Sequence, residues 1–349
     1  MNLLKFHIVF LIILLMYKSI FFVDTFVDTK NYDINPKIMI EEAIKLDLGY
    51  NVLENFPTKV LISKKEKSLI ITPMSYNLNR DRSRVLLAKN KFKTFELFRK
   101  NNIPIPRYYL FNNINSSNVD IIYNQNYIDY PLVVKDVNGA LGNNVFINIT
   151  NKLQLKSAVN TLIDNKKNNI LMEQFIDGHD HRILLYNNEI LDIIMRIPAY
   201  VIGDGKSTIQ SLVDIKNITR RNSGSSQIII NTFYLYQRNL TLDSVIDKEV
   251  KIIVNPLTNF HQGSELKRIP INSVHKDNLK LFTKISKTMR LNIIGIDFMS
   301  LDIRKSYKDN FAKINEVNGT PSLDLHYFAD NKLKTHIHNK ILKMYFNIK

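Results

Sequence analysis

Neither cysteine nor tryptophan occurs among the 349 residues of the chain. Without cysteine the protein has no disulfide, no thiolate metal site and no cysteine nucleophile. The composition is otherwise typical of a globular protein, because 45% of the residues are hydrophobic and 23% are charged. A chain of this length can bury one large core or roughly two to three moderate ones.

Acidic residues are the minority charge, with 32 Asp and Glu against 48 Lys and Arg, for a net charge of +16. Such an excess invites a nucleic-acid interpretation. The lysines, however, are dispersed among many asparagines and isoleucines, and we find no basic stripe interleaved with aromatics. We therefore predict no specific nucleic-acid partner. The excess charge would still attract anionic substrates such as ATP.

The N-terminus carries an apolar run at 6–23. As a helix it would reach roughly 27 Å, against a bilayer core of about 30 Å. No small-x-small cleavage site follows, so a membrane anchor is favoured over a cleaved signal peptide. Lys5 before the run and Asp24 and Asp28 after it favour an external C-terminal part, whereas an ATP-consuming domain is expected in the cytoplasm. An apolar helix packed on the domain is the alternative, and orientation and localisation stay open.

Hydrophobic spacing predicts helices mixed with antiparallel hairpins. Helices are expected at 37–48, 85–100, 152–164, 209–216 and 277–289. Strands are expected at 60–62, 69–71, 132–135, 145–149, 170–175, 183–186 and 189–196, and two acidic strands follow the last helix. No internal repeat is present, and this order favours an α+β architecture over a doubly wound sheet.

The two acidic strands end in hard oxygen ligands. Asp297 lies in "IGIDF", and Glu316 and Asn318 lie in "INEVNG". Glu316 and Asn318 are two residues apart, so on one strand they share a face, and Asp297 comes alongside if the strands pair. Magnesium takes few protein oxygens when phosphates and water complete its octahedron. The pattern predicts a magnesium site, although acids at strand ends are often only turn residues.

Lys135 ends the apolar run "YPLVVK" and precedes the glycine-bearing loop "DVNGALGNN". Lysine is a common counter-charge for phosphate, and glycine lets a backbone approach a ligand closely. Together with the downstream acidic cluster, this arrangement indicates a nucleotide site.

The stretch "LMEQFIDGHDHRILLYNNEILDIIMRIPAYVIGDGKSTIQSLVD" resembles the ATP-grasp superfamily of carboxylate–amine ligases. The similarity is to the ATP-grasp region of cyanophycin synthetases and of fused bacterial glutathione synthetases, and it runs from about Gly49 to about Tyr327. Cyanophycin synthetases continue into a second ligase domain of another class. We therefore do not expect a complete cyanophycin synthetase of the usual kind.

The resemblance implies an ATP-grasp fold in which two lobes with antiparallel sheets clamp ATP. The small lobe would cover 85–175 and the C-terminal lobe 176–345. A small α/β portion at 37–84 would precede them, after an apolar segment and linker at 1–36.

The implied reaction joins a carboxylate, of an amino acid or short peptide, to an amine. ATP phosphorylates the carboxylate, and the amine displaces phosphate from the acylphosphate to give an amide, with ADP as the other product. Catalysis of this kind needs positioned cations rather than a covalent nucleophile on the protein.

On the phosphate side, the resemblance assigns Lys91 and Lys135 to the phosphates of ATP. The loop from Gly139 to Asn144, with Gly139 and Gly142, would cover them. A solvated surface role is the alternative for Lys91, because its helix has many lysines.

On the nucleoside side, Glu173 and backbone groups of Gln174 and Ile176 would read adenine, and Asp180 would take the ribose. An ion pair between Asp180 and Arg182 that only closes a hairpin is the alternative.

At the reacting centre, the resemblance assigns catalytic roles to Arg182, Arg196 and Lys206. The two arginines would face the carboxylate or the γ-phosphate, and Lys206 lies on a Gly-Asp-Gly-Lys loop that would act as a lid. Magnesium, as two ions with manganese as a substitute, would bind Asp297, Glu316 and Asn318. For His179, His181 and His261 the sequence predicts surface or substrate-contact roles rather than a metal site.

The sequence departs from the family on the acceptor side. Asn255 stands at a usual arginine and His261 at a usual serine, and Ser225 and Gln227 replace a His-x-Lys pair. Asn144 replaces a phosphate-loop glycine, a mild change because asparagine tolerates a left-handed conformation. The departures suggest that ATP binding is retained and the substrate changed. An ATP-binding protein without ligase activity is the alternative.

Overall fold

The computed structural model describes residues 33–55, 57–73, 78–79, 81–125, 127–137, 144–223, 225–329 and 336–349. The apolar run at 6–23, Gly139 and Gly142 lie outside the described residues, so the predictions for them are not addressed. Within the described part of the chain, no helix has the length and apolar character that crossing a membrane requires.

Contacts divide the described residues into two compact units. The first holds 33–78, 322–324 and 336–349, and the second holds 79–321 and 325–329. The C-terminal helix therefore groups with the first unit, whereas the sequence placed residues up to 345 in the C-terminal lobe. The other predicted domain boundaries remain predictions.

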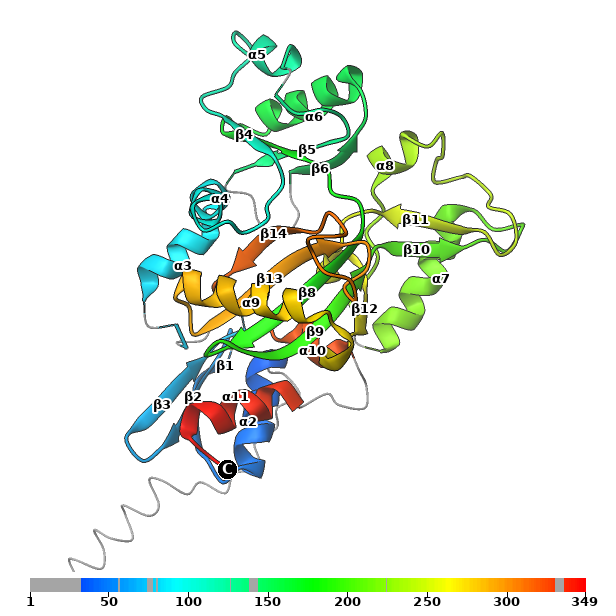
Figure 1. Cartoon of the computed structure of the whole chain (residues 1–349). Helices are drawn as coiled ribbons and strands as arrows, with labels where there is room; N and C mark the ends of the chain where they lie inside the picture. Colours follow the sequence, from blue (N-terminus) through cyan, green and yellow to red (C-terminus); the bar gives the residue numbers. More distant parts are fainter. Residues whose placement is uncertain are drawn as a thin grey trace, which may run out of the picture. The chain divides into compact units, whose positions relative to one another are not determined.

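The first unit is a three-stranded antiparallel sheet with two helices (Figure 1). Its elements are α2 (Ile34–Lys45), β1 (Gly49–Asn55), β2 (Thr58–Lys64), β3 (Lys67–Ile71) and α11 (His336–Phe346). The predicted hairpin is confirmed, since Val60 pairs with Ile71 and Ile62 with Leu69. Asn339 donates a 2.8 Å hydrogen bond to Glu42 of α2, which fastens the C-terminal helix to this unit.

A four-stranded antiparallel sheet, in the order β4-β7-β5-β6, forms one part of the second unit. Its elements are β4 (Tyr108–Phe111), α5 (Asp120–Tyr123), β5 (Leu132–Asp136), β6 (Val145–Ile149), α6 (Lys152–Asp164) and β7 (Ile170–Gln174). Helix α6 covers the sheet because Leu155, Val159 and Leu162 recur at helical spacing and are fully buried. The predicted strands and helix of this region are confirmed.

A five-stranded antiparallel sheet, in the order β12-β9-β8-β13-β14, is the centre of the second unit. Its elements are β8 (His179–Tyr186), β9 (Glu189–Ile197), β12 (Glu265–Arg268), α9 (Lys276–Met289), β13 (Ile293–Ser300) and β14 (Lys313–Asn318). Helix α9 runs across one face of the sheet, as Figure 1 shows, and Phe282 and Ile285 pack there with Ile183 and Ile296. Strand alternation sends the charged residues to the other face.

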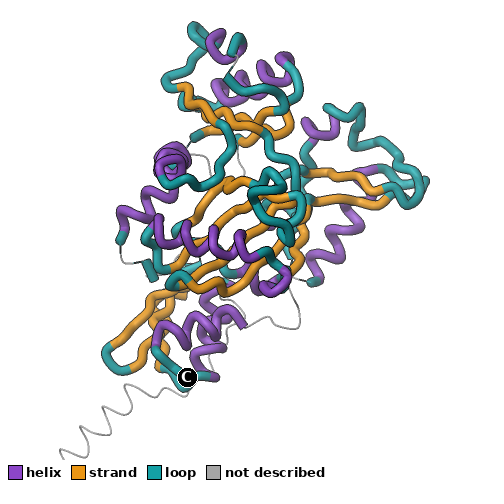
Figure 2. Tube along the Cα trace, viewed as in Figure 1, coloured by secondary structure: helices purple, strands orange, loops and turns teal. Residues whose placement is uncertain are grey.

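A smaller layer extends the second unit, with β10 (Ala199–Ile202) and β11 (Lys251–Asn255) paired antiparallel. Helices α7 (Ile209–Asn222) and α8 (Thr232–Tyr236) pack on this pair, and α7 is longer than the predicted helix at 209–216. Short segments η2 (Phe260–Gln262), η3 (Ile271–Ser273) and α10 (Asp324–Phe328) connect the larger elements. Figure 2 shows the mixture of helices and strands that makes the chain α+β, as predicted.

The single helix predicted at 85–100 is wrong, because the structure has two helices, α3 (Arg82–Lys89) and α4 (Lys91–Lys100). Asn90 between them has an extended backbone, with φ of −96° and ψ of 98°. Its side-chain oxygen accepts a 2.9 Å hydrogen bond from the backbone N–H of Lys93 and so caps α4. The break matters for the site, since it makes Lys91 the first residue of a new helix.

The core beneath the charged face gives the first prediction. Phe282 is fully buried, and its ring meets that of Phe298 edge to face with centroids 5.1 Å apart. Phe282→Ala should lower the free energy of unfolding by about 3–5 kcal/mol through lost burial and a cavity. Urea denaturation measures this. The control Phe311→Ala, at a ring that is 85% exposed, should change it by less than about 0.5 kcal/mol; equal losses in both variants would contradict the assigned core.

Candidate functional site

The charged face of the five-stranded sheet is assembled by strand register. Asp297 of β13 lies opposite Arg182 of β8 on one side and Glu316 of β14 on the other. Asp180 of β8 lies opposite Arg196 of β9. Directly paired residues of antiparallel strands point to the same face, so these side chains meet on the face away from α9.

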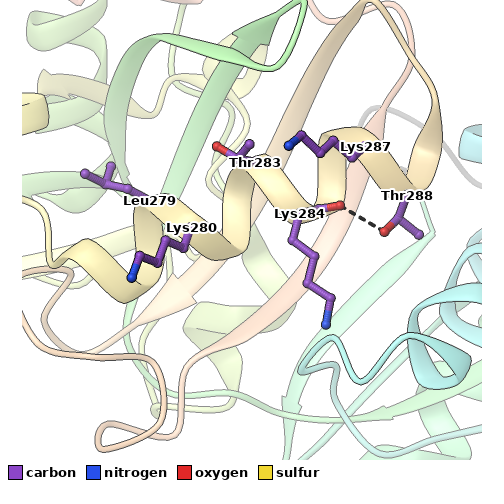
Figure 3. A pocket seen from close by; sticks show the side chains of 6 residues that line it. All are labelled: Leu279, Lys280, Thr283, Lys284, Lys287 and Thr288. Atoms are coloured by element: carbon purple, nitrogen blue, oxygen red, sulfur yellow. Dashed lines mark hydrogen bonds between the residues drawn. The ribbon is translucent and has the colours of Figure 1, made fainter.

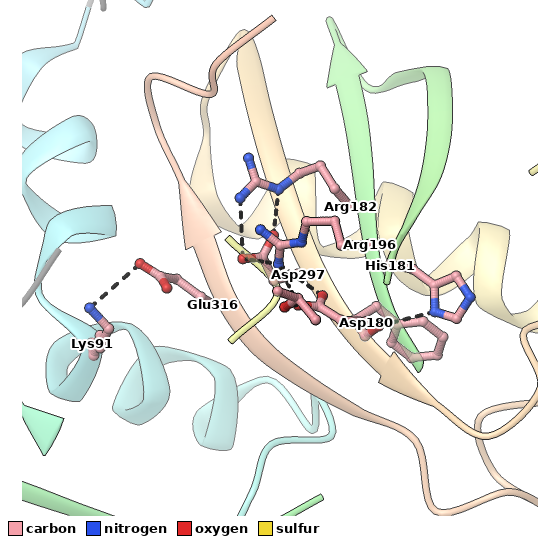
Figure 4. Close-up of polar contacts among 9 residues, drawn as sticks. Lys91, Asp180, His181, Arg182, Arg196, Asp297 and Glu316 are labelled. Carbon is pink, nitrogen blue, oxygen red and sulfur yellow. Dashed lines mark hydrogen bonds and ion pairs between the residues drawn. The ribbon is translucent and has the colours of Figure 1, made fainter. Parts of the chain in front are cut away.

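Asp297 is the centre of this cluster, and it is 4% exposed. Arg182 donates from Nε to one carboxylate oxygen and from Nη2 to the other, the latter at 3.2 Å. Arg196 Nη2 lies 2.9 Å from the second oxygen, and Figure 4 shows both guanidinium groups converging on it. Burial alone would raise the pKa of Asp297, but the two cations outweigh it and hold the pKa below its ordinary value.

Asp180 is held on the same face. Arg196 Nη2 lies 2.8 Å from both of its oxygens, and the hydroxyl of Thr258 donates to one of them. An ion pair does cross the β8–β9 hairpin, but it joins Asp180 to Arg196 rather than to Arg182. Burial opposes the charge of Arg196, yet Asp180 and Asp297 together raise its pKa. The Nε of Arg196 is buried and makes no hydrogen bond within the described residues.

A second buried ion pair lies on the four-stranded sheet. Lys135 Nζ of β5 is 2.7 Å from Glu173 Oε2 of β7, and the residues are 5% and 1% exposed. Burial raises the pKa of Glu173, and the charges of Lys135 and Lys91 only partly counter it. The other oxygen of Glu173 is buried without a hydrogen-bond partner among the described residues. A buried acceptor without a donor is rare in folded proteins, so it marks a candidate ligand contact.

Lys91 connects the two sheets. It begins α4, is 8% exposed, and its Nζ lies 3.5 Å from Glu316 Oε1 of β14. The alternative of a solvated surface lysine is therefore wrong, because the break at Asn90 turns this residue toward the acidic strand. Figure 4 shows Lys91 reaching Glu316 from the helix.

The donor set of the acidic strands fits magnesium. Asp297 and Glu316 are direct cross-strand partners, and Asn318 lies opposite Gly295 on the same face. Two carboxylates and an amide oxygen suit an ion that keeps water and phosphate ligands. The described residues contain no metal-type group of three His, Cys, Asp or Glu side chains, so the fit depends on the Asn318 amide. Without a metal, the charge of Asp297 is balanced by Arg182 and Arg196.

Lys206 stays apart from the cluster. It lies on the exposed loop after β10, where Asp204 accepts hydrogen bonds from the backbone N–H groups of Lys206 and Ser207. Hydrogen bonds from Ser207 and Lys206 lower the pKa of Asp204 to about 2. The loop is therefore pinned by its own aspartate, and the structure shows no contact between Lys206 and the buried charges.

The acceptor-side departure at Asn255 has a structural explanation. Asn255 is 2% exposed, donates a 2.8 Å hydrogen bond to the carbonyl of Ile229 and accepts one of 3.0 Å from the N–H of Leu257. It fastens two loop segments together. At Asn144 the expected left-handed backbone is present, with φ of 56°.

His181 differs from its predicted surface or substrate-contact role. It is 2% exposed, and its Nδ1 lies 3.3 Å from the carbonyl oxygen of Phe298. Burial lowers its pKa. Strand alternation is the reason, because His181 lies between Asp180 and Arg182 and so points to the opposite, α9-covered face.

Sequence reasoning missed a second charged group on the site face. Asp192 of β9 accepts from His326 Nδ1 at 2.9 Å and lies 3.2 Å from Arg268 Nη2 of β12. Alternation along β9, where Asp192 is four residues from Arg196, could have placed the aspartate on this face. The contribution of α10 was not predicted.

A surface pocket lined by α9 residues, drawn in Figure 3, lies across the sheet from all of these charges.

Comparisons with known proteins agree with this architecture. Residues 88–201 match the RimK-like ATP-grasp domain. The cyanophycin synthetase of Crocosphaera subtropica is 29% identical over 75% of this chain and 31% of its own length. The glutathione biosynthesis bifunctional protein of Clostridium perfringens is 25% identical over 91% of this chain and 42% of its own length. The chain thus spans less than half the length of these relatives.

Among solved structures, a bifunctional glutathione synthetase from Pasteurella multocida superposes with a TM-score of 0.60 at 18% identity, covering 91% of this chain and 44% of that one. The fold is therefore the predicted ATP-grasp fold, and the sequence similarity is to ATP-grasp ligases.

The Lys135–Glu173 pair predicts a pH-dependent stability. Lys135→Met should cost about 3–5 kcal/mol near neutral pH, because it leaves Glu173 charged, buried and unpaired. Glu173 already has a folded-state pKa above its ordinary 4.5. Its contribution to the free energy of unfolding is therefore fully present below pH 4.5 and is lost as the pH rises through the folded-state pKa. Removing the lysine raises the folded-state pKa of Glu173 further. The deficit should therefore grow as the pH rises through the parent's folded-state pKa, which lies above 4.5.

Urea unfolding of parent and variant across this pH range measures the effect. The double variant Lys135→Met/Glu173→Gln should recover most of the loss at neutral pH. A deficit that is the same at every pH would mean that the Glu173 charge is not its cause.

Proposed function

We propose that the protein is an ATP-dependent carboxylate–amine ligase that forms an amide or peptide bond and releases ADP and phosphate. The observation that carries the proposal is the buried cluster in which Asp297 lies between Arg182 and Arg196 and directly opposite Glu316. Cations and carboxylates alternate there on one sheet face, as binding a metal–polyphosphate complex requires. The similarity to cyanophycin and glutathione synthetases supports the same reaction class.

For the nucleotide, Lys91 and Lys135 would bind phosphate oxygens in place of their present carboxylate partners. The unpartnered oxygen of Glu173 is an acceptor for the amino group of adenine, with backbone groups of Gln174 and Ile176 completing that contact. Asp180 would accept from a ribose hydroxyl. The loop with Gly139 and Gly142 would cover the phosphates.

For the chemistry, Arg182 and Arg196 would hold the substrate carboxylate against the γ-phosphate. A carboxylate oxygen attacks the γ-phosphorus, and the bond to the β-phosphate oxygen breaks to release ADP. The amine nitrogen then attacks the acyl carbon, the carbon–oxygen bond to phosphate breaks, and the nitrogen loses a proton. Lys206, on its pinned loop, would approach from the side as a lid.

Asp297, Glu316 and Asn318 would hold magnesium, two ions in the full proposal with manganese as a substitute. Bound there, the metal supplies neutralisation of phosphate charge. The arginines that now occupy Asp297 would then be free to turn toward the anionic substrates.

The proposed substrates are small molecules, an amino acid or short peptide as the carboxylate and an amine as the acceptor. The domain would act in the cytoplasm, where ATP is available, with the apolar run at 6–23 as a membrane attachment.

A second candidate function is ATP binding without ligation. It is favoured by Asn255, which holds loop backbone at the position where the resemblance to ATP-grasp ligases implies an arginine. Incubating the full chain with ATP, magnesium and amino-acid pools separates the two. Release of ADP and phosphate together with a new amide in the mass spectrum supports the ligase, whereas tight ATP binding with neither product supports the alternative.

The metal site gives a sharper prediction. Glu316→Gln should fold, since this side chain is 32% exposed, yet lower magnesium-dependent ATP turnover by about a hundredfold or more. The matched control is Glu54→Gln, a glutamate with its own 3.0 Å lysine pair on β1, which should keep parental turnover. Steady-state ADP release and a thermal melt of each variant are the measurements. Normal turnover in Glu316→Gln would remove the metal assignment.

A further inference from the structure

The face of α9 that points away from the sheet carries a row of lysines. Lys276, Lys280, Lys284 and Lys287 are all exposed, and exposed Arg290 follows the helix. Spacings of four, four and three residues place the four lysines on one side of the helix. Figure 3 shows Lys280, Lys284 and Lys287 along this side. The sequence did not reveal this row, because lysines are frequent everywhere and only helical spacing with burial separates these four.

The row is not neutralised within the described residues. None of the ion pairs there involves Lys276, Lys280, Lys284 or Lys287. The acid on the helix, Asp277, accepts from Ser306 at 2.9 Å and lies 3.7 Å from Lys308. Its hydrogen bond and its ion pair are made to the neighbouring loop, and of the row only the charge of Lys280 also acts on it.

That neighbouring loop, 301–312, packs on the first turn of α9. The side chain of Asn278 donates 2.8 Å hydrogen bonds to the carbonyls of Ile303 and Lys305. The loop adds the exposed cations Arg304, Lys305 and Lys308. Arg304 is paired with Asp302 and Lys308 lies 3.7 Å from Asp277, so Lys305 is the loop cation that forms no ion pair among the described residues. The positive charge of the surface therefore comes mainly from the lysine row of the helix.

The same loop exposes two large apolar side chains. Leu301 is 52% exposed and Phe311 is 85% exposed. Each lies two residues beyond the paired Met299 and Lys313 of the β13–β14 hairpin. Phe311 also has a left-handed backbone, with φ of 55°, which is unfavourable for a bulky residue. The fold therefore leaves the ring of Phe311 exposed to solvent on the loop that adjoins the lysine row.

We propose that this surface, called here the basic face and made of the α9 lysine row and loop 301–312, docks on an anionic phospholipid bilayer. The lysines would contact headgroup phosphates, and Phe311 and Leu301 would enter the interface. The combination of a basic helix face with exposed apolar side chains is that of interfacial membrane binding. A single attachment signal gives only reversible binding, so the apolar run at 6–23 would be the second signal.

A bilayer fits this surface better than a nucleic acid does. The aromatic and aliphatic side chains lie together at the hairpin loop instead of being interleaved with the cations, as stacking on successive bases would need. The lysine row spans about 16 Å along a straight helix, suited to a planar array of charges. The charged site lies on the opposite face of the sheet, so docking would leave it free.

The first test compares binding of full-length variants to vesicles of phosphatidylcholine with and without phosphatidylserine. Lys280→Gln/Lys284→Gln/Lys287→Gln should lower the partition coefficient onto the anionic vesicles by about a hundredfold, at about fivefold per lysine. The matched control is Lys152→Gln/Lys156→Gln/Lys166→Gln, two exposed lysines on α6 and one just after it, which should bind as the parent does. The run at 6–23 is present in every protein, so its contribution cancels.

Equal losses in the two triple variants, or equal parental binding to both kinds of vesicle, would overturn the proposal. Duplex RNA that displaces the parent from anionic vesicles, and that the α9 variant no longer binds, would reassign the surface to nucleic acid.

The second test uses the absence of tryptophan. Phe311→Trp places the only tryptophan in the sequence at this loop. With excitation selective for tryptophan, its emission should shift to the blue and be quenched by brominated lipid when phosphatidylserine vesicles are added. Leu153→Trp, at a side chain that is 77% exposed on α6, is the control and should not change. Emission from Phe311→Trp that stays that of a solvated indole while the protein is vesicle-bound would refute the insertion of this loop.

Discussion

The site depends on one buried carboxylate, that of Asp297, held between two arginines. Burial of a lone aspartate is costly, so the position is tenable only while Arg182 and Arg196 stay in contact with it. That requirement fixes the register of three neighbouring strands, because each contributes one of the charges. A shift of one residue in β8 or β13 would send these side chains into the core under α9.

Much of this arrangement can be predicted from the sequence, for a local physical reason. Period-two alternation separates Arg182 from His181 and Asp297 from Phe298 once the strands are recognised, and the helix at 277–289 follows from its apolar spacing. The break at Asn90 could not be predicted, because the apolar positions of α3 and α4 fit one continuous helix. Only the side-chain cap at Asn90 separates the two helices. The ion-pair partners also could not be predicted from the sequence, because Arg196 pairs with Asp180 and with Asp297 through long-range strand pairing.

The two faces of the five-stranded sheet explain why two surfaces of different chemistry coexist in this unit. Apolar residues of β8 and β13 bury α9 on one side, which leaves the outer half of that helix to carry Lys280 and Lys284 into solvent. Charged residues of the same strands line the other side. Because a strand has two faces, the charged residues of the site do not determine which residues occupy the outer face of α9. The residues of the charged site and those of the outer face of α9 can therefore be substituted independently.

The composition of the buried cluster argues for what it binds. Together with the Lys135–Glu173 pair of the four-stranded sheet, four cations (Lys91, Lys135, Arg182 and Arg196) pair with four carboxylates (Glu173, Asp180, Asp297 and Glu316), of which Glu316 is partly exposed. Such networks contribute little net stability compared with apolar packing, so stability does not account for them. A ligand that joins a divalent cation to a polyanion could replace both partners of these ion pairs at once. The metal would bind the carboxylates, and the phosphates would bind the lysines and arginines. A magnesium–nucleotide complex has that double character, whereas a ligand of a single charge sign would leave one half of the cluster buried without partners.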